Sequence, residues 1–405
     1  MNLAALLKHY REQLTWKLAP VEENTILFTS FGGHYSDNPK YISQAVHRLY
    51  PDKKIIWLVK PQYAADLPDY VTGVDIDSPE ADHWRTTAGI VVDNVYGGRE
   101  YYLTSDALPR RAQFRLEAFL KDKPAQKVFT TWHGTPLKRM GRDQLGSVIR
   151  DFACPNTTMV MGNRYTLDIM EHLTFGKIPM KLLGTPRNDI LFQADQVQAS
   201  LKQKLGLPAD KKILLFAPTF RSDSANTADT NIHRSGLDQL EQMDAQKLFS
   251  ALSSRFGGDW VMVCRFHYHV EAQVDWDVLE QKYPGRFLNG NLHDDMAEYL
   301  CCADALLTDA SSSMYDYALT GRPCLLFFPD LGHYASQERG FYTPIEDLPF
   351  PAAVQFPQLL DAIETFDQST YDAAVQKMLT DYGFVDDADS SERIAKLIFA
   401  GSDDA

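Results

Sequence analysis

The alternation of short, continuously apolar runs with amphipathic stretches constrains this fold most. Such runs occupy residues 25–31, 54–59, 89–95, 127–132, 157–162 and 180–184 in the first half of the chain. The scheme repeats at residues 211–220, 259–266, 285–290, 304–309 and 322–329. Continuous apolar runs between amphipathic helices are typical of parallel strands buried on both faces. The pattern therefore predicts an α/β protein with two doubly wound Rossmann-like domains that face each other across a cleft.

Chain length supports two domains, because 405 residues exceed what one ordinary core holds. The stretch 190–211 is polar and helical in pattern, so we place the join there. We expect an N-terminal, acceptor-side domain over 1–195 and a C-terminal, donor-binding domain over 196–405. The segment 221–236 is rich in Ser, Asn, Thr and Asp, which predicts a mobile loop and a candidate lid.

Composition and charge exclude several classes of protein. A hydrophobic content of 44% is typical of a soluble globular chain. The sequence has no apolar run of the roughly 18 residues that a membrane span needs, and its start lacks the features of a signal peptide, so we expect neither. A formal net charge of -14 argues against a general nucleic-acid binder. Basic residues nevertheless gather near the N-terminus and within 109–142, which suits an anionic substrate or membrane surface as well as ordinary solvated helix faces.

The cysteines show neither disulfide nor zinc spacing. We expect buried free thiols in a reducing cytosol. The residues concerned are Cys154, Cys264, Cys301, Cys302 and Cys324.

Chemically active residues follow the predicted strands. In open α/β sheets, ligands bind outside the carboxyl ends of the strands. The strand ends carry HYSDNP, WHGTP, GTPRND, APTFR, RFHYH and TDASSS. Turns alone need Gly, Pro, Ser or Thr, but they do not need repeated His and Arg. The sequence therefore predicts a binding site at these edges.

The segment WHGTP is the first candidate for chemistry. Thr135 followed by Pro136 predicts the start of a helix. Gly134 would permit close approach of a substrate, and a neutral His133 imidazole could accept a hydroxyl proton near pH 7. A histidine packed behind the sheet is the structural alternative. The candidate acceptor or cleft residues are Gly134, Thr135, Asn38 in the first helix, and Arg187 in GTPRND.

The second half supplies a candidate anion site. Arg265 and His267 form a cationic pair that suits a diphosphate, and metal binding is disfavoured because no acidic ligand is near in sequence. Serines at a helix start offer hydroxyls and amides to a phosphate, although ordinary N-capping explains one of them. The further candidate donor-binding residues are Pro218, Thr219, Arg221, Asp309, Ser311, Ser312, Ser313 and Asp316.

Taken together, these segments resemble a known family. SDNPKYI, TTWHGTPLKRMG, GTPRNDIL, LLFAPTFR, RFHYH, TDASSSMYDYALTGRPCLLFF and ERGFY follow the order seen in CDP-glycerol glycerophosphotransferases, the teichoic-acid primases and polymerases. The resemblance covers about residues 25–345. It implies a GT-B-like fold, a peripheral location at the cytoplasmic face of a Gram-positive membrane, and no catalytic metal or cofactor. CDP-glycerol or CDP-ribitol would be a substrate, and a lipid-linked polymer the acceptor.

The resemblance also implies residue roles. His133 matches the proposed general base, His267 the second essential histidine near the diphosphate, and Asp309 with the following serines the donor-binding turn. Ala310 and Tyr268 depart from the tyrosine and proline often found there, and both departures concern donor specificity rather than reaction class.

Three alternatives remain at this stage. A nucleotide-sugar-dependent GT-B glycosyltransferase would use the same architecture. A non-catalytic assembly protein could keep the fold and bind polymer, although it would need neither His133 nor His267. A nucleotide-sugar epimerase is a third possibility, because such enzymes also pair two domains of this kind.

Overall fold

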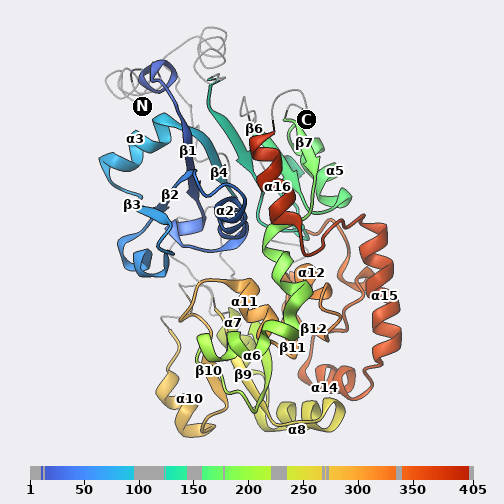
Figure 1. The fold of residues 1–405 in the computed structure, drawn as a ribbon. Coiled ribbons are helices and arrows are strands. Elements are labelled where there is room, and N and C mark those ends of the chain that lie inside the picture. Colours follow the sequence, from blue (N-terminus) through green and yellow to red (C-terminus); the bar gives the residue numbers. More distant parts are fainter. Residues whose placement is uncertain are drawn as a thin grey trace, which may run out of the picture. The chain divides into compact units, whose positions relative to one another are not determined.

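Two compact units make up the chain. The computed structural model describes residues 11, 14–94, 123, 125–143, 157–176, 178–219, 235–266, 270, 273–333 and 340–400. Chain contacts group 1–133, 151–189 and 385–405 into a first unit, and 134–150 with 190–384 into a second. Each unit has a parallel sheet with helices packed on it, which confirms the prediction of two doubly wound α/β domains (Figure 1).

The sheet of the first unit has the order β3-β2-β1-β4-β5-β6-β7, and all neighbouring pairs are parallel. The strands are β1 (Glu22–Thr29), β2 (Lys54–Val59), β3 (Val71–Asp75), β4 (Ala88–Asp93), β5 (Lys127–Thr130), β6 (Thr157–Met161) and β7 (Met180–Leu182). The order reverses between β1 and β4, so the topological switch point lies between their carboxyl ends. The sequence did not predict β3, because this edge strand buries only Val74.

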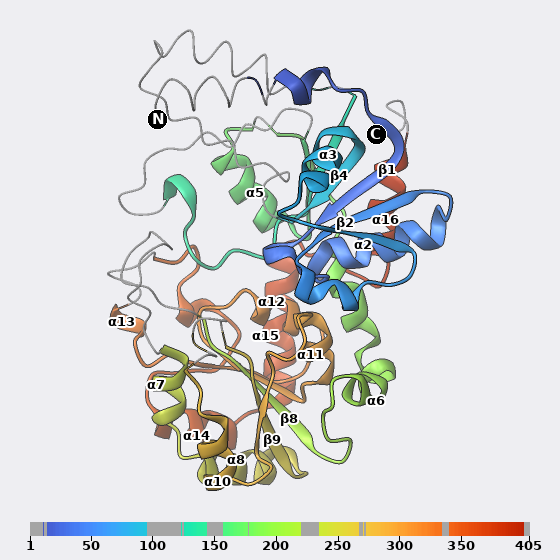
Figure 2. The same cartoon turned by 90° about the vertical axis from the view of Figure 1, so that its left-hand side faces the viewer.

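Helices cover both faces of this sheet. Ile26 and Phe28 of β1 share a core with one set of helices, whereas Leu27 packs with Trp84 on the other side, as the alternation of a strand requires. The first set contains α2 and α16, and the second contains α3 (Figure 2). The described α-helices of this unit are α2 (Asp37–Leu49), α3 (Pro79–Thr87), α5 (Arg164–Leu173) and α16 (Ser390–Phe399).

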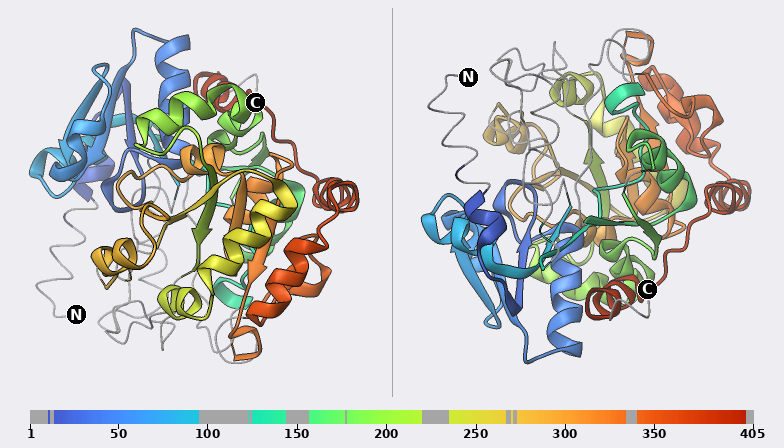
Figure 3. Two further views of the ribbon diagram at one scale, coloured as in Figure 1. Left: turned by 90° about the horizontal axis from the view of Figure 1, so that it is seen from below. Right: turned by 90° about the horizontal axis from the view of Figure 1, so that it is seen from above.

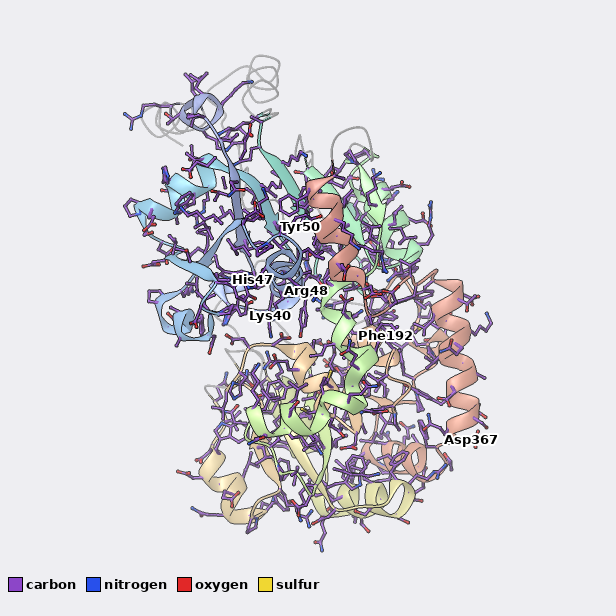
Figure 4. The ribbon with its side chains drawn as sticks, viewed as in Figure 1. Lys40, His47, Arg48, Tyr50, Phe192 and Asp367 are labelled. Carbon is purple, nitrogen blue, oxygen red and sulfur yellow. The ribbon has the colours of Figure 1, made fainter. Side chains whose placement is uncertain are left out.

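The C-terminal helix α16 packs against α2 in the first unit. Figure 4 labels Arg48 and Tyr50 at the end of α2; Arg48 pairs with Glu392 at 3.2 Å, and the Tyr50 and Phe399 rings are 4.3 Å apart. Ile394, Ala395 and Ile398 are fully buried in this core. We expected the whole of 196–405 to lie in the second domain, but these apolar contacts place the C-terminal helix with the first unit.

The sheet of the second unit has the order β10-β9-β8-β11-β12-β13 and is also parallel, with its switch point between β8 and β11. Its strands are β8 (Lys212–Ala217), β9 (Trp260–Cys264), β10 (Phe287–Asn289), β11 (Ala305–Thr308), β12 (Cys324–Phe327) and β13 (Ala352–Ala353). Helices α8 and α14 lie side by side (Figure 3). Within the described residues of this unit, the α-helices are α6 (Ala194–Lys204), α7 (Ser235–Glu241), α8 (Ala245–Phe256), α10 (Trp276–Lys282), α11 (Met296–Cys302), α12 (Ser313–Ala318), α13 (Leu331–His333), α14 (Phe356–Glu364) and α15 (Gln368–Asp381).

The predicted helix start at Thr135 and Pro136 is wrong. Residues 134–140 are not helical. Instead, the Leu137 carbonyl accepts a hydrogen bond from the Tyr342 N–H (2.8 Å), and the Arg139 N–H donates to the Gly340 carbonyl (3.1 Å). A helix would have bonded these backbone groups to its own backbone. The observed pairing instead joins two of the sequence segments that carry the family resemblance.

No helix in the described part of the chain is long and apolar enough to cross a membrane.

Candidate active site

His133 lies at the switch point of the first unit. It follows β5, and its Nδ1 is 3.3 Å from the carbonyl oxygen of Asn94, the residue after β4. Phe31 lies just after β1, and its ring packs edge-on against the imidazole, with the ring centroids 5.0 Å apart. The Trp132 ring centroid lies 3.8 Å from the imidazole. The structure thus places the predicted base where ligands of doubly wound sheets bind.

The surroundings of His133 fix its tautomer and its charge. A carbonyl oxygen only accepts hydrogen bonds, so the contact with Asn94 puts the proton on Nδ1 and leaves the Nε2 lone pair to accept another. Burial lowers the pKa of His133 to about 4; the Asp37 carboxylate and the Asn94 carbonyl oppose this shift, and Arg187 adds to it. The imidazole is therefore neutral at pH 7 and able to take up a proton.

Asn38 and Arg187, predicted as acceptor or cleft residues, support the loop that carries His133. The fully buried Asn38 donates from Nδ2 to the Trp132 carbonyl (3.2 Å) and accepts the Arg187 N–H at Oδ1 (3.1 Å). The Arg187 guanidinium donates to the His133 carbonyl and to Asp37 Oδ1, both at 2.9 Å. Sequence reasoning missed Asp37, although its position beside Asn38 was a usable signal.

The backbone around His133 turns through unusual conformations. Trp132 has φ 54°, in the left-handed region, and Gly134 has φ 142°, which favours glycine. Thr135 follows and is buried. Gly134 is thus explained by the turn itself, and its predicted contact with a substrate stays a prediction.

At the second unit's switch point, Thr219 and Asp309 come together. Pro218 and Thr219 follow β8, and Asp309 follows the neighbouring strand β11. Asp309 Oδ1 accepts from the Thr219 N–H (2.8 Å) and hydroxyl (2.7 Å), while Oδ2 accepts from Gln239 Nε2 (3.0 Å). Asp309 is fully buried, and its carboxylate ties the chain after β8 to the chain after β11. Gln239 lies on α7 and does not follow a strand in the sequence, so no sequence signal pointed to it.

Arg265 has an internal role in the structure. Its guanidinium donates to the carbonyl oxygens of Gly290, His293 and Asp294, each at 2.6 Å. The same group lies 5.1 Å from the centre of the Tyr299 ring. These contacts order the loop after β10. Contact of Arg265 with a diphosphate, as the sequence predicted, would compete with them.

Asn291 in this loop holds the chain that leads to the second predicted histidine. Its side-chain amide accepts from the Phe266 N–H (2.9 Å) and donates to the Phe266 carbonyl (2.6 Å), as a neighbouring strand would. His267 itself and Arg221 lie outside the described residues, so their predicted roles stay predictions.

The serine-rich turn begins α12. Ser311 Oγ accepts from the Ser313 N–H (3.3 Å) and lies 2.8 Å from Ser313 Oγ, whereas the N-cap residue, Ser312, makes no side-chain capping bond. Ser312 is partly exposed, and Asp316 is buried within the helix. Phosphate binding by this turn and donor binding by Asp316 stay predictions.

Two further sequence expectations concern cysteines and metals. Cys264, Cys301, Cys302 and Cys324 are buried free thiols, and Cys154 lies outside the described residues. The described residues contain no group of three or more His, Cys, Asp or Glu that could hold a metal ion.

Comparison with known proteins decides the family. The model of a family described as CDP-Glycerol:Poly(glycerophosphate) glycerophosphotransferase matches residues 11–400. The chain belongs to this family. The resemblance predicted from its sequence segments is thereby confirmed.

Individual members differ from this chain in length. The chain is 29% identical to the teichoic acid poly(glycerol phosphate) polymerase of Staphylococcus epidermidis, with 95% of this chain and 52% of that protein covered. It thus spans about half the length of the first curated relatives it matches. It is 28% identical to the teichoic acid glycerol-phosphate transferase of Staphylococcus aureus, with 93% of each covered. Staphylococcus aureus ribitol-phosphate polymerases align with only 53% of the chain.

A solved structure of the wall teichoic acid polymerase TagF, a histidine-to-asparagine variant soaked with CDPG, has a similar fold. The TM-score is 0.73 at 27% identity, with 98% of this chain and 94% of that chain covered. This similarity confirms the predicted GT-B-like class of two doubly wound units.

Proposed function

We propose that this protein transfers a polyol phosphate, glycerol phosphate in the first place, from a CDP-activated donor to a hydroxyl of a lipid-linked teichoic-acid-type acceptor, releasing CMP. The observation that carries the proposal is His133: a neutral imidazole with a free Nε2 lone pair, at the switch point of a sheet, in a member of the glycerophosphotransferase family. A protein that only bound polymer would not need a base prepared in this way.

The proposed step balances as a substitution at phosphorus. The acceptor oxygen forms a bond to the phosphorus that carries the polyol, and the bond from that phosphorus to the bridging oxygen of CMP breaks. CMP leaves with the bridging oxygen, and the hydroxyl proton passes to Nε2 of His133. Phosphoryl transfer of this kind depends mainly on positioning and on charge stabilisation.

The low pKa of His133 has a consequence for this step. A base with a pKa of about 4 is weak, and general-base catalysis is most efficient when the pKa lies near the working pH. A donor diphosphate bound nearby would raise the pKa of His133, because a negative charge favours the imidazolium. Donor binding would thus make His133 a stronger base. In the unoccupied enzyme, the low pKa keeps the imidazole unprotonated.

Glycerol is the preferred polyol because proteins named for glycerol phosphate match nearly the whole chain, whereas the ribitol-phosphate polymerases match about half. The acceptor and the membrane-bound setting rest on the family alone. We expect the basic residues near the N-terminus and within 109–142 to hold anionic lipid. Co-sedimentation with anionic liposomes at low salt tests this, and background binding would contradict it.

The central test is CMP release by the purified protein. CDP-glycerol and CDP-ribitol are supplied separately with a lipid-linked disaccharide acceptor, and nucleotide-sugars serve as competing donors. The variant His133→Asn removes the base, and His83→Asn, an exposed histidine of the same unit, is its matched control. Acceptor-dependent CMP release that His133→Asn abolishes and His83→Asn retains supports the proposal. Turnover of a nucleotide-sugar instead would indicate a glycosyltransferase, and no turnover of any donor would indicate a binding protein.

A further inference from the structure

Two chain segments hold the His133 loop in a hydrogen-bonded set that we call the clamp: one supplies Asp37 and Asn38, and the other supplies Arg187. The clamp holds two consecutive carbonyls, those of Trp132 and His133, through the Asn38 amide (3.2 Å) and the Arg187 guanidinium (2.9 Å). Two further bonds tie the clamp together, from the Arg187 N–H to Asn38 and from the guanidinium to Asp37. Every clamp side chain thus either contacts the His133 loop or supports one that does.

The clamp is buried and conformationally strained. Asn38 is fully buried, and the Arg187 and Asp37 side chains are 10% and 16% exposed. Asp37 and Trp132 both adopt the left-handed region, with φ values of 60° and 54°. Non-glycine residues persist in that region only where surrounding contacts enforce it, and such residues cluster at functional sites. A helix start alone does not require a partner from residue 187.

We propose that Asp37, Asn38 and Arg187 are positioning residues, which fix the His133 backbone so that Nε2 points at the acceptor hydroxyl, and that Asp37 is the counter-charge for the imidazolium formed on proton transfer. The proposal rests on the proposed function, because it assigns His133 the base role. It also changes the expectation for Arg187, which acts on the base and not on the acceptor.

The two charges of the clamp act on His133 in opposite directions. Asp37 raises the pKa of His133, and Arg187 lowers it. Among the described residues, these are the charged groups that act on the imidazole. Because they pair with each other, the clamp supplies a carboxylate close to the base without an excess negative charge. Removing one partner leaves the other charge unpaired, so the pKa of His133 should rise when Arg187 is lost and fall when Asp37 is lost.

The test compares Arg187→Leu with Arg393→Leu. The Arg393 guanidinium also binds a carbonyl and a carboxylate in the first unit, those of Leu183 (2.9 Å) and Asp387 (2.6 Å). The two variants therefore lose similar contacts, and only Arg187→Leu loses those to His133. Asp37→Asn, which keeps the shape of the side chain, is the second clamp variant.

For the clamp variants we expect kcat to fall by about 10²-fold with the donor KM unchanged, since a small misplacement of a catalytic group has this cost. In Arg187→Leu the acid limb of the kcat/KM profile moves to higher pH, and added guanidinium ion restores part of kcat. In Asp37→Asn the limb moves to lower pH. Arg393→Leu keeps the wild-type profile.

The His133 ring resonances, followed by NMR titration, give a readout that needs no activity. Their midpoint rises in Arg187→Leu if the clamp acts as proposed, even if no donor is turned over, in which case the proposed function alone fails. An unchanged midpoint and profile, with only the loss of thermal stability seen in Arg393→Leu, would overturn the clamp. A raised donor KM at constant kcat would overturn it too, and would make Arg187 a substrate contact.

Discussion

Replacing Asp309 by alanine or by asparagine should have very different costs. Within the described part of the chain, the buried carboxylate accepts two hydrogen bonds from Thr219 and one from Gln239. Alanine leaves the Thr219 N–H and the Gln239 amide without an acceptor, and we expect a loss of about 3–5 kcal/mol in the second unit. Asparagine keeps an oxygen for Thr219, and its new N–H group faces Gln239.

Gln239 provides the means to accommodate asparagine. Its Oε1 is buried and has no hydrogen-bond partner within the described chain. A flip of the Gln239 amide would turn this oxygen toward the asparagine N–H group, so the cost should fall to about 1–2 kcal/mol, the loss of charge assistance. The double variant Asp309→Asn, Gln239→Leu should cost less than the two single changes added together, because Gln239→Leu alone leaves a buried charged oxygen without its donor, whereas beside asparagine it removes only a neutral hydrogen bond.

Hydrogen exchange of the β8 and β11 peptides is the suitable assay, since two-state unfolding of a chain with two units is not assured. It reports the stability of the second unit directly. Donor KM is measured in parallel. Equal costs for alanine and asparagine, or strict additivity in the double variant, would refute the hydrogen-bonding argument. A large rise in KM for asparagine at unchanged stability would show that Asp309 contacts the donor directly.

Other perturbations test the remaining parts of the site. Burial raises the pKa of Asp189 to about 6, so this group binds more protons in the folded than in the unfolded state between about pH 4 and 6; first-unit stability should fall by about 3 kcal/mol as pH rises through that window, and Asp189→Asn should flatten the curve seen by urea unfolding. Gly134→Ala, at φ 142°, should lower kcat and melting temperature together, and a fully active variant would contradict the strained turn. Arg265 reaches three carbonyls from two nitrogens and Arg265→Lys has only one, so amides of 290–294 should exchange faster, measured by mass spectrometry against α8 as reference.

The fold was predictable from sequence where burial was two-sided. The runs at 54–59 and 304–309 coincide closely with β2 and β11, because their side chains are almost all buried. The edge strand β3 and the two-residue β13 carried no such signal. The Thr-Pro pair at 135–136 favours a helix start, but pairing of 137–139 with 340–342 overrides it, and local sequence does not reveal that pairing.

The site was predictable in its location and less so in its roles. His133, Thr219 and Asp309 do lie at the switch points, because strand ends can be located from apolar runs. What a polar side chain contacts depends on residues far away in sequence: Arg187 is 54 positions from His133, and Asp309 is 90 from Thr219. Arg265 illustrates this point. The sequence suggested that its guanidinium binds phosphate, but in the structure it binds carbonyl oxygens of a loop 25–29 residues later in the chain.

In both units, an asparagine amide binds the backbone of the residue that precedes a predicted site histidine. A histidine that follows a strand has no ladder of backbone hydrogen bonds to fix it, because the strand pairing has ended. In the first unit, the amide of Asn38 replaces that ladder by holding the carbonyl of Trp132, directly before His133. In the second, the amide of Asn291 holds both backbone groups of Phe266, directly before position 267. An asparagine side chain carries the donor and acceptor of a peptide group, so it can extend a strand edge by one residue without continuing the sheet. We therefore predict that the amide in each unit positions the histidine that follows it in the chain. Replacing either asparagine by leucine, which has a similar size and no hydrogen bonds, should impair catalysis more than it impairs folding.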